Sequence, residues 1–152
     1  MEIGKPAPAF DLPATGDRTI SLASLRGKKV VLYFYPKDST PGCTKEGQAF
    51  RDFYPVFTEH GAEVLGVSRD SIRSHENFAA KQEFPFPLLS DKEEELCKAY
   101  DVIKEKNMYG RKVMGIERST FVIDPQGNLA REWRKVKVNG HVDEVLEYIK
   151  GL

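Results

Sequence analysis

The run Lys29–Tyr35 (KVVLYFY) restricts the folds open to this chain more than any other segment. After its first residue the run is continuously apolar, and it is rich in β-branched and aromatic residues. It lacks the polar alternation of a strand that has one face in water. Strands of this kind lie buried in a sheet that is covered on both faces. The run therefore predicts an α/β protein built around a central sheet.

The segments around this run alternate between strand-like and helix-like patterns. Two short strand-like segments, 10–12 and 19–21, flank a Thr-Gly-Asp turn and predict an N-terminal hairpin. Residues 104–115 are expected to form a charged loop. Without repeats or linkers, the pattern predicts one domain, 1–152, with a central mixed β-sheet flanked by helices. Further strands are expected at 63–68, 84–89, 119–123 and 129–138, and helices from about 43 to 57 and at 71–83, 91–100 and 141–150.

The composition of the 152 residues, 40% hydrophobic and 30% charged, is typical of a globular protein. The 23 basic and 23 acidic side chains cancel, so no net charge attracts nucleic acid or an anionic membrane surface. The N-terminus has no cationic segment followed by an apolar one, and no run has the length of a membrane span. We therefore expect a cytoplasmic protein without nucleic-acid or membrane partners.

The chain has two cysteines, Cys43 and Cys97, too few for a disulfide scaffold in a reducing compartment. Neither cysteine has a second cysteine or a histidine two to five residues away, and His60, His75 and His141 are isolated in the sequence. A metal site is therefore not expected. A catalytic or redox-sensing role for a cysteine stays open.

Cys43 follows the central run in the stretch Thr40-Pro41-Gly42-Cys43, which has the pattern of a helix start. Thr40 suits the N-cap and Pro41 suits the first helical position, so Cys43 falls in the first turn. The free N–H groups and the helix dipole at that place favour a thiolate. The alternative is a small apolar residue that fills a gap in the core.

A dithiol oxidoreductase would carry a second cysteine where this chain has Thr40, so thiol–disulfide exchange within this motif is excluded. One sulfur, one hydroxyl and several backbone donors then meet at the start of a helix. This combination suits a polar substrate that the sulfur attacks once.

The motif Pro36-x-x-x-Thr40-x-x-Cys43 resembles the active-site signature of the peroxiredoxins. Its surroundings are similar to those of the Q-type branch of that family, also called bacterioferritin comigratory protein. The similarity covers nearly the whole chain, through the segments Gly4–Phe10, Phe34–Glu46, Phe50–Asp52, Pro87–Asp91 and Gly115–Asp124.

The resemblance implies a thioredoxin-like fold with an N-terminal β-hairpin, and a thiol-dependent peroxidase that uses no metal, flavin or haem. Cys43 would attack hydrogen peroxide or an alkyl hydroperoxide and become a sulfenic acid, which thioredoxin or another external thiol would reduce. Thr40 would orient the peroxide, Pro36 would shield the sulfur from water, and Arg118 would stabilise the thiolate. Without the resemblance, Arg118 has the pattern of a surface cation at the end of a strand.

Many Q-type members carry a resolving cysteine five residues after the first, where this chain has Gln48. Cys97 is the only other sulfur. Its neighbours Leu96 and Tyr100 favour a buried structural thiol, and a resolving role is the alternative. We therefore expect a one-cysteine mechanism, and by resemblance to Q-type relatives we expect a monomer.

Glu46 lies one helical turn after Cys43 and is expected to be a solvated charge that suits a helix N-terminus. Neither Glu46 nor Arg51 is assigned to the site. Two other functions fit the same residues: a redox-sensing thiol switch that uses Cys43 without turnover, and a non-catalytic thioredoxin-like module. Consumption of peroxide over many turnovers would separate an enzyme from both.

Overall fold

The apolar run of the sequence forms β3 (Lys29–Phe34), whose residues after Lys29 are all buried. The computed structural model describes residues 1–152. On one side β3 pairs in parallel with β4 (Ala62–Ser68), and on the other it pairs antiparallel with β8 (Ser119–Ile123). The strand is thus enclosed at both edges as well as on both faces, as its composition predicted.

Seven strands form one mixed sheet in the order β2-β1-β5-β4-β3-β8-β9. The predicted N-terminal hairpin is present and adds its first strand to the sheet through the pair Ala14 and Leu89. The parallel pairs are β3 with β4 and β4 with β5. The remaining strands are β1 (Asp11–Ala14), β2 (Arg18–Ser21), β5 (Leu88–Ser90) and β9 (Leu129–Trp133).

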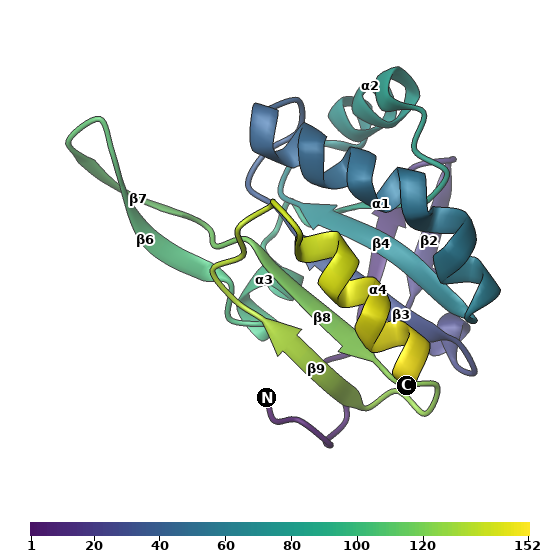
Figure 1. Cartoon of the computed structure of the whole chain (residues 1–152). Helices are drawn as coiled ribbons and strands as arrows, with labels where there is room; N and C mark the ends of the chain where they lie inside the picture. Colours follow the sequence, from purple (N-terminus) through teal and green to yellow (C-terminus); the bar gives the residue numbers. More distant parts are fainter.

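Helices cover both faces of this sheet, which confirms the predicted architecture (Figure 1). Alternate residues of β3 point to opposite sides, so Val31 and Tyr33 join one hydrophobic cluster while Leu32 and Phe34 join the other. On the Tyr33 side lie α1 (Pro41–Glu59), α2 (Ile72–Gln82) and α4 (His141–Gly151). On the other side lie α3 (Glu95–Ala99) and the short 3-10 turn η1 (Ala23–Leu25).

The segment 104–115 is not a loop, and this expectation was wrong. It forms most of a hairpin made of β6 (Ile103–Met108) and β7 (Arg111–Ile116), which is a separate two-stranded sheet that projects from the body (Figure 1). Both turn residues, Tyr109 and Gly110, have positive φ, as the tightest hairpin turns require. Because both faces of the hairpin meet water, its sequence lacks the apolar alternation that identifies a strand.

Two further elements are shorter than expected. The helix predicted over 91–100 begins only at Glu95, because Glu94 takes a left-handed conformation with φ of 63°. The strand predicted over 129–138 ends at Trp133, and the N–H of Val136 donates instead to the carbonyl oxygen of Arg118. None of the helices combines the length and the apolar character needed to cross a membrane.

Candidate active site

The loop after β3 places Cys43 in the first turn of α1, as the sequence predicted. Thr40 is extended (φ −83°, ψ 153°) and the helix begins at Pro41. The Thr40 hydroxyl does not cap the helix but donates to the carbonyl oxygen of Lys37 at 2.8 Å. The first-turn N–H groups are therefore left without a side-chain partner near the sulfur. Cys43 itself is only 2% exposed and belongs to the cluster under α1.

Arg118, between β7 and β8, brings a cation to this sulfur. Its Nη2 lies 3.4 Å from Cys43 Sγ, and its side chain is only 15% exposed, so it is not a surface cation. Gly42 makes the approach possible, since a Cβ at that position would lie 3.1 Å from Nη2. Burial lowers the pKa of Arg118, but Glu46 and Cys43 together raise it above its ordinary value, so the guanidinium stays charged.

Glu46 corrects the sequence-based expectation of a solvated charge. Its residue is 0% exposed, and its Oε1 accepts a hydrogen bond from Arg118 Nη1 at 2.6 Å. Burial raises the pKa of Glu46 to about 7, against the opposing charge of Arg118. The second carboxyl oxygen, Oε2, is buried without a hydrogen-bond partner. Glu46 is thus part of the site, and its spacing of three residues from Cys43, on the same helix face, was the available signal.

The hairpin contributes a second cation that sequence reasoning missed. Lys106 of β6 donates its ammonium group to the carbonyl oxygen of Ile116, two residues before Arg118. Burial and then the nearby charge of Arg118 lower the pKa of Lys106, while Cys43 opposes this shift. The base of the hairpin therefore shares the electrostatic environment of the sulfur.

The other residues discussed from the sequence form no hydrogen bond with the sulfur. Pro36 is half-buried and occupies the same loop as Thr40. Gln48 donates to the side chain of Gln82 at 3.0 Å. Arg51 donates to the backbone of the same glutamine at 2.9 Å, so both residues join α1 to α2.

Cys97 lies on the other side of the sheet. It is fully buried in the cluster that contains α3, whereas Cys43 belongs to the cluster under α1. The Asp91 carboxylate accepts the backbone N–H of Cys97 at 2.7 Å. Burial, followed by the hydrogen bond and charge of Asp91, raises the pKa of Cys97 far above its ordinary value.

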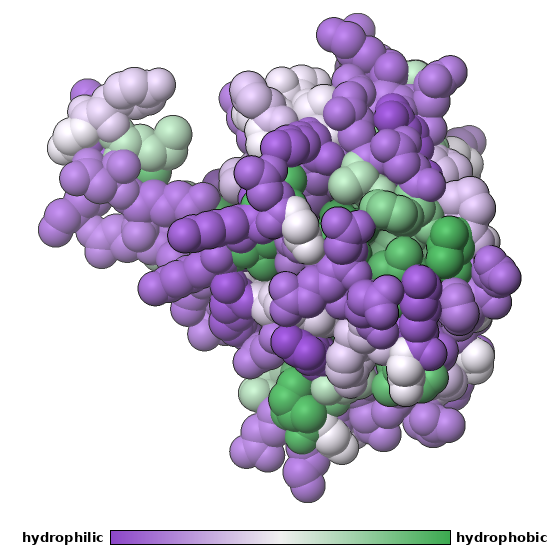
Figure 2. Space-filling view, viewed as in Figure 1, coloured by the Kyte–Doolittle hydropathy of each residue, from purple (hydrophilic) through white to green (hydrophobic).

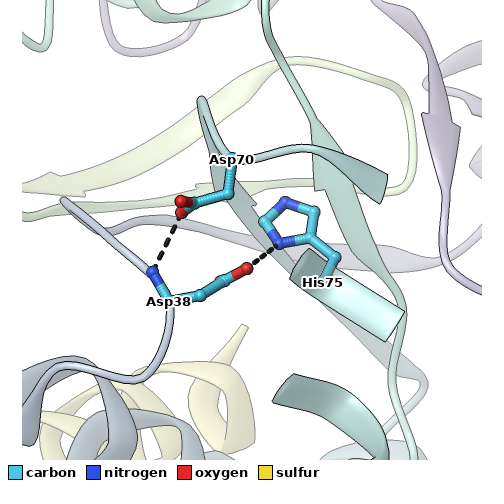
Figure 3. Close-up of side chains that lie close together, drawn as sticks. All are labelled: Asp38, Asp70 and His75. Atoms are coloured by element: carbon cyan, nitrogen blue, oxygen red, sulfur yellow. Dashed lines mark hydrogen bonds and ion pairs between the residues drawn. The ribbon is translucent and has the colours of Figure 1, made fainter. Parts of the chain in front are cut away.

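The fold also brings together three polar side chains, those of Asp38, Asp70 and His75 (Figure 3). Their possible metal-ligand atoms lie within 4.8 Å of one another. Both ring nitrogens of His75 already have protein partners, Asp38 Oδ2 at 2.7 Å and the carbonyl oxygen of Leu89 at 2.9 Å. The arrangement is therefore a hydrogen-bonded network rather than an open cation site. His75, which is isolated in the sequence, thus lies beside the loop that carries Thr40.

The sequence matches a family model and several known proteins. Residues 3–132 match the model described as the AhpC/TSA family. Peroxiredoxin Bcp of Xanthomonas campestris pv. campestris is 58% identical over 147 residues, which cover 95% of this chain and 92% of that protein. Peroxiredoxin Bcp of Bacillus subtilis is 49% identical over 152 residues, covering 100% and 97% of the two chains.

Solved structures give the same result. A structure described for the alkyl peroxide reduction activity of Xanthomonas campestris bacterioferritin comigratory protein superposes with a TM-score of 0.92 at 52% identity, covering 99% of this chain and 98% of that one. Peroxidoxin BcpB of Mycobacterium tuberculosis gives a TM-score of 0.88 at 32% identity, covering 100% and 98%. The expected thioredoxin-like fold is thereby confirmed. The chain belongs to the AhpC/TSA family, within its Bcp or Q-type peroxiredoxin branch, and is a thiol-dependent peroxidase.

Proposed function

We propose that Cys43 is the peroxidatic residue of this enzyme. Its thiolate attacks the terminal oxygen of a hydroperoxide, so that an S–O bond forms as the O–O bond breaks. The product on the protein is a sulfenic acid, and the departing oxygen takes up a proton to leave as water or an alcohol. The observation that carries this assignment is the contact of 3.4 Å between Cys43 Sγ and the charged guanidinium of Arg118.

Arg118 and the helix start stabilise the charges of this reaction. The guanidinium favours the thiolate before the attack and the negative charge that grows on the departing oxygen during it. The N–H groups of the first turn of α1 have no side-chain partner and add to the same positive environment. Glu46 holds the guanidinium through the bond of 2.6 Å to its other terminal nitrogen.

Thr40 and Pro36 complete the proposed site. Because the Thr40 hydroxyl gives its hydrogen to the carbonyl oxygen of Lys37, its lone pairs are directed elsewhere and can accept the O–H of a peroxide. Pro36 has no N–H and is half-buried in the same loop, which suits a residue that limits access of water to the sulfur. The substrates proposed are hydrogen peroxide and alkyl hydroperoxides; alkyl peroxide reduction is named for the solved Xanthomonas relative.

We propose that an external thiol, such as that of thioredoxin, reduces the Cys43 sulfenic acid. The separation of Cys97 by the sheet and the raised pKa of its thiol argue against a resolving role for it. The protein is proposed to act as a monomer of one domain, 1–152, in the reducing environment of the cytoplasm.

Two measurements test this function. The intact mass after one equivalent of peroxide should show one added oxygen atom. Prior alkylation of Cys43 should prevent this addition, which would locate the oxygen on Cys43. With excess reductant, each molecule should then consume many equivalents of peroxide. A single stoichiometric oxidation without turnover would instead indicate a redox switch.

A further inference from the structure

The loop that carries the active-site residues is held by a buried polar network centred on Asp38 (Figure 3). The Tyr35 hydroxyl donates to Asp38 Oδ1 at 2.6 Å, and the Ser74 hydroxyl donates to Oδ2 at 2.8 Å. His75 Nδ1 lies 2.7 Å from the same Oδ2. The backbone N–H of Asp38 donates to Asp70 Oδ2 at 2.9 Å. The side chains of Asp38 and His75 are 2% and 0% exposed, so water does not satisfy them.

The hydrogen bonds assign a proton to each ring nitrogen of His75. Nε2 faces the carbonyl oxygen of Leu89 at 2.9 Å, and a carbonyl only accepts, so Nε2 donates. Each oxygen of the Asp38 carboxyl group accepts a hydroxyl hydrogen, one from Tyr35 and one from Ser74, as the oxygens of a carboxylate do. Burial, followed by the neighbouring Tyr33 and Asp38, raises the pKa of Tyr35, so its hydroxyl keeps its proton. An ionised carboxylate accepts only, and Nδ1 must therefore donate as well.

This network holds a segment whose backbone is strained. Asp38 lies two residues after Pro36 and two residues before Thr40. Ser39, between Asp38 and Thr40, has a φ of 63°, a left-handed conformation that costs free energy in a residue other than glycine. Two partners of Asp38, Ser74 and His75, belong to α2. His75 in turn binds β5 through Leu89, so the loop is tied to two rigid elements.

We propose that the buried Asp38–His75 ion pair, with His75 as an imidazolium, positions the Pro36–Cys43 loop for peroxide reduction. The inference rests on the proposed role of Cys43. The pair does not touch the sulfur; it keeps Pro36 and Thr40 in the arrangement that a peroxide needs. The titratable groups that face the imidazolium are Asp38, Asp70 and Tyr35, of which the two carboxylates supply the compensating charge.

A spectroscopic measurement tests the charge state. In an imidazolium both ring nitrogens carry protons and have similar ¹⁵N chemical shifts, whereas a neutral ring has one protonated and one bare nitrogen. His141 is the internal reference: it is also buried, its Nε2 lies 2.8 Å from the Thr120 hydroxyl, and burial lowers its pKa to about 4. At pH 7 His75 should show two similar shifts and His141 two different ones. A neutral pattern for His75 would overturn the proposal.

A kinetic comparison tests the positioning role. Reaction of Cys43 with an alkylating agent needs only an accessible thiolate, whereas reaction with peroxide also needs Thr40 and Pro36 in place. His75→Gln should therefore slow the oxidation of Cys43 by hydrogen peroxide about ten- to hundredfold, as misplaced reacting groups do. Its alkylation rate should change less than about threefold. Equal effects on both rates, or no effect on the peroxide rate, would contradict the positioning role.

The controls separate this inference from the function on which it rests. His141→Gln also changes a buried histidine and should leave both rates unchanged. If His75→Gln does not fold, the double variant Asp38→Asn/His75→Gln leaves no unpaired buried charge and is used for the same comparison. Slow oxidation of Cys43 in the parent protein would contradict the proposed function, whereas fast oxidation in both parent and variant would contradict the inference alone.

Discussion

Cys43 and Cys97 occupy equivalent positions, each the third residue after the N-cap of a helix, but they meet opposite charges. Cys43 lies 3.4 Å from the guanidinium of Arg118. At Cys97 the Asp91 carboxylate already accepts the N–H groups of the first turn, and it raises the pKa of the thiol together with burial. A helix start therefore does not by itself make a cysteine reactive. We infer that the charged side chain next to the cysteine decides whether the thiol is reactive.

The largest effect is expected from replacing the sulfur that faces the cation. Cys43→Ser should lower peroxide consumption to the uncatalysed rate, because a hydroxyl in the same place stays protonated and is a poor nucleophile. Peroxide consumption with excess reductant measures this. Near-normal turnover in the variant would show that Cys43 is not the peroxidatic cysteine.

Removing the charge of Arg118 should reduce the difference in reactivity between Cys43 and Cys97. Arg118→Met keeps much of the side-chain volume but loses the charge that, as we propose, stabilises both the thiolate and the departing oxygen. The rate of Cys43 oxidation should fall about 10²- to 10³-fold, as for other preorganised donors at an active site. Stopped-flow oxidation measures it, with the exposed Arg111→Met of β7 as the matched control. Equal oxidation rates for the two variants would show that Arg118 does not contribute to the reaction of Cys43.

Glu46, which binds Arg118, should make the stability of the fold depend on pH. The pKa of Glu46 rises from 4.5 to about 7 in the folded protein, so between these pH values the folded state holds a proton that the unfolded chain releases. The contribution of Glu46 to stability is therefore full below pH 4.5 and is lost as the pH rises to about 7. This loss corresponds to about 3 kcal/mol.

Glu46→Gln cannot ionise and should lack this dependence. From acid to pH 8, the free energy of unfolding of the variant should gain about 3 kcal/mol relative to the parent, measured by urea denaturation at each pH. Glu59→Gln, exposed at the end of the same helix, should show no such change. A constant difference between parent and Glu46→Gln would mean that folding does not change the pKa of Glu46.

The smallest effect on activity is expected at the second cysteine. Cys97→Ser should keep peroxidase activity within about twofold with a small-thiol reductant, because a disulfide needs Cα atoms within about 7 Å and the sheet separates the two clusters. Peptide mapping after peroxide treatment should find no Cys43–Cys97 bond. A dominant bond of this kind, with lost thioredoxin-dependent turnover in Cys97→Ser, would make Cys97 a resolving cysteine and leave the peroxidase function unchanged.

Local patterns predicted the parts of the fold that they determine. The run that became β3 indicated its own burial, and the Thr40–Pro41 pair indicated where α1 begins. The approach of Arg118 to Cys43 was expected only through the family resemblance, because 75 residues separate them and no local pattern connects them. The hairpin of β6 and β7 was missed because its faces are both solvated.

The buried polar groups were the hardest to predict. A carboxylate in the first turn of a helix is ordinarily exposed, and the burial of Glu46 follows from the guanidinium that reaches it from another segment. The pairing of Asp38 with His75 depends on the packing of α2 against β5 and against Tyr35, which follows β3, and it joins residues 37 positions apart. Composition and periodicity contain no information about such long-range pairs.

The hairpin of β6 and β7 also suits the attachment of reporter groups. Its turn, Tyr109–Gly110, is far from the seven-stranded sheet (Figure 1), and the exposed side chains of Met108, Val113 and Met114 give it a hydrophobic patch within a hydrophilic surface (Figure 2). Insertions are tolerated best at such exposed turns. A fluorophore placed there would sit on an arm whose base, through Ile116, continues directly to Arg118.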